Sequence, residues 1–419
     1  MEQPNLAMIP SGVKATKVYS IMPESGVGDF TFARSSTAYR LNKDGLWETS
    51  ASNLPRLHYD LSNGNPDSCP CLLLEPASTN ALGFSELFSS WGSTRSAIVA
   101  DSIMSPDGTV NASKTKDDGS TGTDTSQRFL SVLVNNGQDY TFSVFAKKGS
   151  MDFVALRTGN FSNGGGTGET FFNLATGAVG TTYTFHTASI EKYPNGWYRC
   201  SIKFTAGTDL SGTVLIRQAS ANGTSTVPLD GNSFIYLWGA QFEQSSFATT
   251  YIKTTSNISS TRSAETCNSA GDVSTFNSEQ GILFLEVSAL ANDSTYRMIS
   301  MSDGGITNRI TFFYQNSNNQ FAFEGGGGLG VYNLSITQTN YNKIALSYKQ
   351  NNCKVYLNGS LVGTDTSYTG LSAGIITQLN FDRGDGANDF YGKCKDLRVY
   401  DTEGMTDTEI TNLLTQLTQ

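Results

Sequence analysis

The stretch from residue 234 to residue 265, FIYLWGAQFEQSSFATTYIKTTSNISSTRSAE, constrains the fold more than any other part of the chain. Residues 234–242 are aromatic and aliphatic with small residues between them, which predicts a strand buried on at least one face. In residues 245–263, 11 of 19 residues are Ser or Thr, and such a polar run keeps neither a strand nor a helix period. We therefore predict a seam here, between two separate modules.

The segments on both sides of the seam have the pattern of short strands. They alternate with period 2, and Gly-rich or Asn-Gly breaks separate them at intervals of roughly 8–12 residues. The 419 residues exceed the ~250 residues at which a single core stops growing. We predict an all-β fold with two tandem jelly-roll-like β-sandwich domains, a small N-terminal module and a short C-terminal helix. The predicted bounds are 1–82, 83–264 and 265–419.

The two ends of the chain carry local signals. Asp44-Gly45 predicts a tight hairpin, but residues 1–82 hold too few apolar residues for a core of good size. We expect them to pack on the next domain, on a neighbouring subunit or on a larger assembly. Near the C-terminus, Thr406 and Glu409 form a capping box that predicts a helix ending at Leu417.

The charge pattern excludes one class of partner. The net charge is −9, the pI is near 4.9, and no Lys/Arg cluster opposes that field, so we expect no nucleic-acid partner. The N-terminus lacks a basic start followed by an apolar core, and no run of ~18 apolar residues occurs. We expect no secretory signal and no membrane span, and synthesis in a cytoplasm that the protein leaves, if at all, by another route.

The cysteines and histidines give no motif for metal binding or catalysis. Cys69-Pro70-Cys71 is a C-x-C pair rather than C-x-x-C, and the other four cysteines are scattered. We interpret the cysteines as buried free thiols, with a Cys353–Cys394 disulfide as the alternative. His58 and His186 stand beside no nucleophile motif, and we interpret both as structural.

The sequence predicts no enzyme. Glycanases on a concanavalin A-like fold need several carboxylates on one strand face, as in E-x-D-x-E, and the strand-like segment 281–288 carries Glu286 alone. Convergence of carboxylates from distant segments stays open as an alternative, which would make the protein a glycan depolymerase.

Two tryptophans are candidates for ligand binding. Trp197 and Trp238 could stack on a sugar, because an aromatic ring binds the apolar face of a pyranose. A core or turn-closing role is the alternative for each, since both lie beside strand-like sequence.

One loop is a candidate for a cation. Asp382, Asp385, Asn388 and Asp389 place oxygen ligands on a glycine-containing loop, as Ca²⁺ requires, although the spacing does not match an EF-hand. A solvated turn is the alternative. The same loop contains Arg383-Gly384-Asp385, a three-residue match to the integrin-recognition sequence with nothing else to support it.

Long phrases of the first 264 residues resemble a group of bacteriophage head-fibre and tail-fibre proteins with a carbohydrate-binding-module-like sandwich. They are PNLAMIPSGVKATKVYSIMP, GDFTFARSSTAYRLNKDGLWE, NLPRLHYD, CPCLLLEPASTNAL, TFSVFAKKGS, NGWYRCSIKF and WGAQFEQSSFATTYIKTT. The resemblance implies a virion protein, most simply a homotrimer, that contacts capsid or tail proteins of the same virion and adheres to host-surface glycans. A cellular lectin is the further alternative, and it leaves residues 1–82 unexplained.

Residues 281–417 resemble the laminin-G and concanavalin-A-like family. The phrases are NKIALSY, KVYLNGSLVG and CKDLRVYD, followed by the acidic helix. In this resemblance Asn358-Gly359 is a hairpin turn, and the last strand and helix close the sandwich. Because this module lies farthest from the expected attachment end, we predict that residues 267–419 fold alone and bind glycan through loops 325–330 and 382–389.

Overall fold

The central sandwich consists of two six-stranded antiparallel sheets. The computed structural model describes residues 2–161, 166–314, 320–325, 328–333 and 336–419. One sheet has the order β12 (Gly92–Thr94), β16 (Gln127–Leu133), β23 (Ser211–Ala219), β18 (Phe153–Gly159), β19 (Gly168–Asn173), β20 (Ala178–Val179). The other has the order β13 (Ser96–Met104), β14 (Val110–Asp117), β25 (Phe234–Glu243), β17 (Asp139–Lys147), β22 (Trp197–Thr205), β21 (Thr187–Lys192).

The alternation of side chains in these strands builds the core between the two sheets. Phe142, Phe204 and Phe242 from one sheet and Leu156 and Phe172 from the other are fully buried together. Their partners along each strand point to the outer faces, as the period of 2 requires. Two short strands, β15 (Thr123–Thr125) and β24 (Thr226–Pro228), pair at one end.

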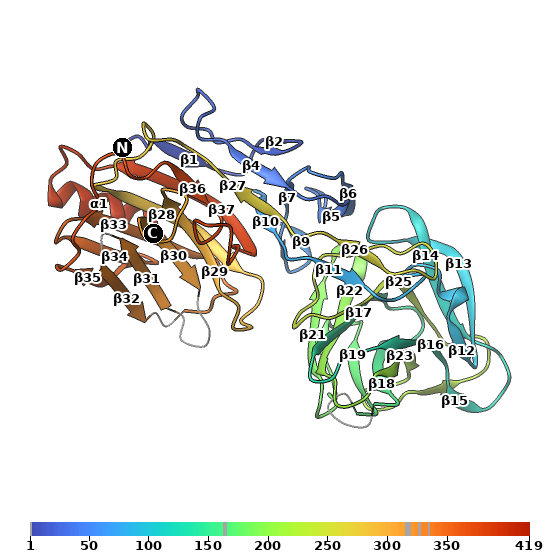
Figure 1. Cartoon of the computed structure of the whole chain (residues 1–419). Helices are drawn as coiled ribbons and strands as arrows, with labels where there is room; N and C mark the ends of the chain where they lie inside the picture. Colours follow the sequence, from blue (N-terminus) through green and yellow to red (C-terminus); the bar gives the residue numbers. More distant parts are fainter. Residues whose placement is uncertain (1, 162–165, 315–319, 326–327, 334–335) are drawn as a thin grey trace.

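The C-terminal sandwich is built on an eight-stranded sheet (Figure 1). Its order is β35 (Ser360–Asp365), β34 (Cys353–Leu357), β33 (Asn342–Lys349), β28 (Gln280–Ala289), β37 (Gly392–Asp401), β10 (Cys71–Leu74), β7 (Arg56–His58), and β1 (Leu6–Met8) also pairs with β37. The facing strands are β30 (Arg309–Tyr314), β29 (Arg297–Ser302) and β36 (Gln378–Asn380), and β31 (Gln320–Gly325) pairs with β32 (Gly328–Asn333).

The C-terminal helix α1 (Asp407–Thr418) covers the outer face of this sheet. Ile410, Leu413 and Leu414 bury against Ile282 and Phe284 of β28. In the capping box, the Thr406 side chain accepts from the Glu409 backbone N–H, and the Glu409 side chain accepts from the Thr406 backbone N–H. In the turn between β34 and β35, Asn358 and Gly359 both have positive φ. The predictions of an all-β fold, of the helix and of this hairpin are confirmed.

Strands from the first 82 residues complete the C-terminal sheet. β1 and β10 pair with β37, and Leu6, Met8, Leu72 and Leu74 lie in the C-terminal core. A second sheet joins β2 (Val13–Lys14), β3 (Lys17–Val18) and β4 (Phe30–Ala33) to β27 (Thr266–Asn268) after the seam. The apolar residues of the N-terminal segment therefore share the core of a module that is distant in sequence.

The rest of the N-terminal segment lies between the two sandwiches (Figure 1). It contains the hairpin β5 (Ala38–Leu41) and β6 (Trp47–Ser50), the hairpin β8 (Leu61–Ser62) and β9 (Asn65–Pro66), and β11 (Ser78–Asn80), which pairs with β26 (Ser260–Arg262) of the seam. Leu41 and Trp47 pack against Phe145 and Tyr193 of the central sandwich. The segment thus joins the two modules.

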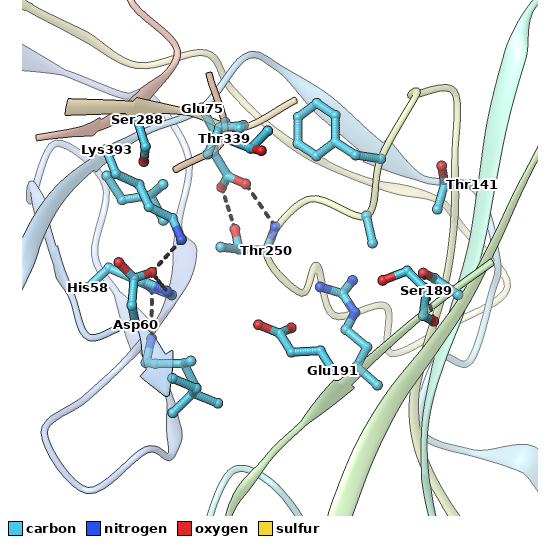
Figure 2. Close-up of a pocket in the computed structure, with 18 of the residues that line it drawn as sticks. His58, Asp60, Glu75, Thr141, Ser189, Glu191, Thr250, Ser288, Thr339 and Lys393 are labelled. Atoms are coloured by element: carbon cyan, nitrogen blue, oxygen red, sulfur yellow. Dashed lines mark hydrogen bonds and ion pairs between the residues drawn. The ribbon is translucent and has the colours of Figure 1, made fainter. Parts of the chain in front are cut away.

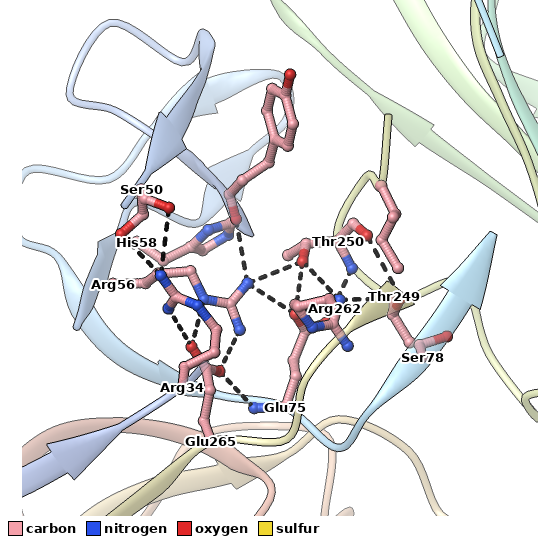
Figure 3. A network of polar contacts seen from close by, with 12 residues as sticks. Arg34, Ser50, Arg56, His58, Glu75, Ser78, Thr249, Thr250, Arg262 and Glu265 are labelled. Atoms are coloured by element: carbon pink, nitrogen blue, oxygen red, sulfur yellow. Dashed lines mark hydrogen bonds and ion pairs between the residues drawn. The ribbon is translucent and has the colours of Figure 1, made fainter. Parts of the chain in front are cut away.

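A buried network of arginines and glutamates fixes this junction (Figure 3). Arg56 bonds Glu265 through two nitrogens and Glu75 at 2.8 Å, while Arg34 lies 2.7 Å from Glu265 and Arg262 lies 3.0 Å from Glu75. All five side chains are at most 2% exposed. Burial alone would raise the pKa of Glu75, but the charges of Arg262 and Arg56 hold it well below its usual range.

Candidate functional site

A cleft of about 550 Å³ opens where the N-terminal segment and the two sandwiches meet (Figure 2). Figure 2 shows His58, Asp60 and Lys393 on one side and Thr141, Ser189 and Glu191 on the other. The lining is rich in hydroxyl groups and comes from all three parts of the chain: Leu41, Trp47, His58, Asp60, Leu61, Leu73, Glu75, Thr141, Thr187, Ser189, Ile190, Glu191, Tyr193, Arg199, Ser201, Lys203, Ser246, Phe247, Ala248, Thr250, Ser288, Ala289, Leu290, Thr339, Lys393.

The wall from the central sandwich is a ladder of polar pairs on β21 and β22. Thr187 lies opposite Lys203, Ser189 opposite Ser201, and Glu191 opposite Arg199. Strand period 2 turns all six side chains to the outer face of the sheet, and all six line the cleft. This wall therefore presents hydroxyl and charged groups in a regular row.

The wall from the N-terminal segment holds His58 and Asp60. The backbone N–H of Leu41 donates to His58 Nδ1 at 3.2 Å, so the neutral ring carries its proton on Nε2, which lies 3.9 Å from Asp60 Oδ1. Burial and the charge of Lys393 lower the pKa of His58 to about 3. With its acceptor nitrogen occupied, His58 is not placed to act as a general base.

Two of the carboxylates that line the cleft are paired with cations. Asp60 binds Lys393 and accepts a 2.5 Å hydrogen bond from the Tyr341 hydroxyl. Burial alone would raise the pKa of Asp60. The charge of Lys393 outweighs this effect, so the pKa of Asp60 lies below its usual value. Glu75 belongs to the arginine network, and its pKa is lowered as well. Neither carboxyl group holds a proton at neutral pH.

The two candidate tryptophans lie in the protein interior. Trp197 is 1% exposed and Trp238 is 0% exposed, and both belong to the aromatic cluster around Phe145 and Tyr251. The Trp197 indole N–H donates to Met104 O at 3.1 Å. Neither ring face is open to a sugar, so their burial fits the core alternative.

The candidate cation loop does not gather its oxygens. Asp382 is 1% exposed and accepts hydrogen bonds from Asn268 Nδ2 at 2.8 Å and from the Gly384 backbone N–H, while Asp385 is paired with Arg383. Asp389 accepts from the Tyr391 hydroxyl at 2.9 Å. The fourth candidate, Asn388, donates to Met298 Sδ at 3.6 Å. Within the described ranges, no group of three or more His, Cys, Asp or Glu is arranged to hold a metal ion.

Other candidate residues lie away from the cleft. His186 is buried, with Thr158 Oγ1 and Thr170 Oγ1 at 3.0 and 2.9 Å from its ring nitrogens, and burial lowers its pKa to about 4. Glu286 is half-buried and lies opposite Asp396 in the register. The predicted loop at residues 325–330 includes 326 and 327, which lie outside the described residues.

All six cysteines are free thiols. Cys71, Cys200, Cys267, Cys353 and Cys394 are buried, as expected, whereas Cys69 is exposed. The alternative Cys353–Cys394 disulfide is wrong, because β34 and β37 are separated in the sheet by β33 and β28. Among the helices that the structure describes, none has the length and the apolar character to cross a membrane.

The residues of the cleft had a weak signal in the sequence. The alternation in Thr187-Ala-Ser189-Ile-Glu191 indicates a strand with one polar face, but such a face is usually only solvated. That this face borders a cleft depends on the position of the N-terminal segment, which joins both sandwiches. The pattern of a single strand carries no information about that position.

Residues 284–411 match the family model described as the Concanavalin A-like lectin/glucanases superfamily. The C-terminal sandwich is thus a concanavalin A-like domain of the laminin G type. No curated protein matches the chain. The resemblance of residues 4–264 to phage fibre proteins stays a prediction.

Solved structures show distant similarity. Domain 4 of AbnA, a GH43 extracellular arabinanase from Geobacillus stearothermophilus in complex with arabinotriose, aligns at 16% identity over 37% of this chain and 73% of that chain (TM-score 0.31). The Ruminococcus gnavus IT-sialidase CBM40 bound to alpha2,6 sialyllactose aligns at 16% identity over 32% and 83% (TM-score 0.27). Trypanosoma rangeli sialidase aligns at 12% identity over 93% and 77% (TM-score 0.27). TM-scores this low do not establish a shared fold.

Proposed function

We propose that this chain is a carbohydrate-binding β-sandwich protein and that the cleft binds the glycan. The observation that carries the proposal is the match of residues 284–411 to a superfamily of lectins and glucanases. The cleft adds a site of suitable size, since small-ligand sites commonly measure about 300–1,000 Å³.

The lining of the cleft suits a sugar chemically. Sugar hydroxyls both donate and accept hydrogen bonds, as do the hydroxyls of the exposed Thr187 and Ser189. The half-buried Phe247 offers an apolar contact beside these groups. A pyranose has polar edges and an apolar face, so this mixture of surfaces complements it.

We propose binding without cleavage. Glycoside hydrolysis requires a carboxylic acid with a raised pKa and a second carboxylate across the glycosidic bond. Asp60 and Glu75 have lowered pKa values and are held by cations. A reducing-end assay on bound polysaccharide should detect no cleavage, whereas turnover would support the depolymerase alternative.

A bulky substitution in the cleft tests the proposed site. Ser189→Trp places a large ring on the exposed polar wall and should abolish glycan binding measured by calorimetry or on a glycan array. Ser131→Trp is the matched control, because Ser131 is also an exposed strand serine of the central sandwich but lies on β16 and not in the cleft. Equal binding by both variants would place the glycan elsewhere.

We also propose that the protein is a structural protein of a bacteriophage virion, a head or tail fibre that attaches to host-surface glycans. The support is the resemblance of residues 4–264 to that group. The proposal includes a homotrimer in contact with capsid or tail proteins. Immunogold electron microscopy should label the particle, and light scattering should give about three times the 45.1 kDa chain mass. Unlabelled particles would contradict the virion role.

A further inference from the structure

Two facing residues of the cleft wall are oppositely charged but form no ion pair. Glu191 of β21 lies opposite Arg199 of β22, yet no nitrogen–oxygen contact within 4.0 Å joins these two described residues. Arg199 is 6% exposed and donates instead to Thr249 O at 2.7 Å and Ser143 Oγ at 3.1 Å. Glu191 is exposed and accepts from the Tyr193 hydroxyl at 2.8 Å.

Apart from Arg199, the other charged side chains of the cleft are paired with opposite charges. Lys393 is paired with Asp60, and Lys203 lies 2.8 Å from Asp139. Glu75 is neutralised by the buried arginines of the junction. The carboxylate of Glu191 is therefore an exposed charge of the cleft that no ion pair neutralises, although the buried Arg199 lies opposite it on β22 and Lys393 interacts with it electrostatically.

We infer that the cleft selects uncharged glycans and that Glu191 sets this selectivity. The inference rests on the proposed glycan-binding function and names the ligand class for that same cleft. A carboxylate accepts charge-assisted hydrogen bonds from sugar hydroxyls, which are stronger than neutral ones. A uronate or sialate carboxylate in the same place faces a like charge, and such a contact strongly disfavours a wrong partner.

The neighbouring pair on the ladder extends this recognition. Ser189 and Ser201 lie two residues along the strands from Glu191 and Arg199, roughly 6.6 Å away. Their hydroxyls carry no charge: Ser189 can donate or accept, and Ser201, which donates to Ser189 O at 3.4 Å, can accept. A sugar that donates to Glu191 therefore finds further neutral partners along β21 and β22, whereas no unpaired cation on this ladder is exposed to balance an acidic group.

The test compares charged and uncharged glycans on the full chain and on two variants. A glycan array first ranks the binding of individual oligosaccharides. It carries uncharged hexose and N-acetylhexosamine oligosaccharides beside uronate and sialate oligosaccharides. Dextran against carboxymethyl-dextran, and hydroxyethyl-cellulose against carboxymethyl-cellulose, then compare ligands that share a backbone and differ in charge. We expect the wild type to bind the best uncharged glycan more than tenfold tighter than any carboxylated one.

Glu191→Gln keeps the shape of the side chain and removes the charge, so it should reduce the preference to below threefold. Glu279→Gln removes the same charge at an exposed position outside the cleft and should leave the preference unchanged. In the wild type, 1 M salt should narrow the preference because it screens the repulsion.

Three results would overturn the inference. In the first, carboxylated glycans bind the wild type as tightly as uncharged ones. The inferred selectivity then fails, but the proposed glycan-binding function does not. In the second, Glu191→Gln keeps the wild-type preference, which shows that another group sets it. In the third, no glycan of either class binds, and then the proposed function fails and the inference fails with it.

Discussion

Arg56 and Glu265 form a two-pronged ion pair in the interior of the protein, with Arg56 Nε 2.9 Å from Glu265 Oε1 and Arg56 Nη2 bonded to Oε2. Arg56 lies on β7 of the N-terminal segment, and Glu265 follows the seam. Both side chains are 0% exposed. This pair fixes the position of the segment that connects the two sandwiches, and therefore the shape of the cleft.

We predict that Glu265→Gln destabilises the junction strongly. Removing one partner of a buried ion pair leaves an uncompensated charge and costs about 3–5 kcal/mol. The melting temperature should be many degrees lower than that of the wild type. Asp385→Asn, which breaks the partly exposed pair with Arg383, is the control and should cost at most about 1 kcal/mol. Similar melting of both variants would contradict a structural role for the network.

The network should also make stability depend on acid pH. The pKa of Glu75 is lowered from its usual 4.5, so the folded state binds its proton less readily than the unfolded state. The stability that this group contributes is complete above pH 4.5 and is lost as the pH falls below that value. Urea unfolding from pH 6 to pH 3 should show the loss. Glu75→Gln should be less stable at pH 6 and should show a smaller decline below pH 4.5.

The two histidines should make the stability of the protein depend on pH in a higher range than Glu75 does. Their pKa values are lowered to about 3 for His58 and about 4 for His186, against 6.5 in the unfolded chain. The unfolded state therefore takes up protons first, and stability falls as the pH drops below 6.5. Each histidine should contribute a slope of about 1.4 kcal/mol per pH unit between pH 6 and pH 4.5. His186→Gln should remove the contribution of one histidine to the slope of unfolding free energy against pH. An unchanged slope in this variant would contradict the prediction.

Asp382 should behave as a structural residue rather than as a calcium ligand. Asp382→Ala removes the acceptor for Asn268 Nδ2 and for the Gly384 N–H, and leaving these donors unsatisfied costs about 1–3 kcal/mol. Asp385→Ala, in the same loop but exposed, should lower the melting temperature much less. Calcium or EDTA should shift neither melting curve, and a clear rise with calcium would restore the cation site.

The fragment 267–419 should not fold stably alone, in contrast to the expectation from the sequence. It lacks β1 and β10, so one edge of β37 loses its partners and the core loses Leu6, Met8, Leu72 and Leu74. We expect aggregation or binding of a hydrophobic dye, and partial rescue when residues 1–82 are co-expressed. A cooperative melt of the fragment alone would show that these strands are dispensable.

Several parts of the structure could be predicted from neighbouring residues. The strand β28, the turn at Asn358-Gly359 and the Thr406–Glu409 capping box each depend on residues within one element or one turn. The sequence pattern contains all the information that such features need. The hairpin at Asp44-Gly45 belongs to the same group, since Gly45 adopts φ 71° between β5 and β6.

The candidate site could not be predicted in this way. Ser189 and Glu191 read as one polar face of an ordinary strand, and the buried positions of Thr249, Thr250 and Arg262 contradict the polar appearance of the seam. Polar residues are usually exposed, so the sequence favours a loose connection there. Only the convergence of Arg56, Glu75 and Glu265 supplies the partners that make this burial favourable.

Neighbouring residues are enough to specify the alternating strands, the glycine and asparagine turns and the capped helix, because the free energies of these elements depend on adjacent residues. Which strands pair, and which charged side chains meet, depends on contacts between residues that are distant in the sequence. Leu72 pairs with Cys394 near the other end of the chain, and Arg56 pairs with Glu265, which lies 209 residues away. Such pairs form only when the whole fold brings them together, since each depends on burial that both sandwiches and the N-terminal segment create jointly.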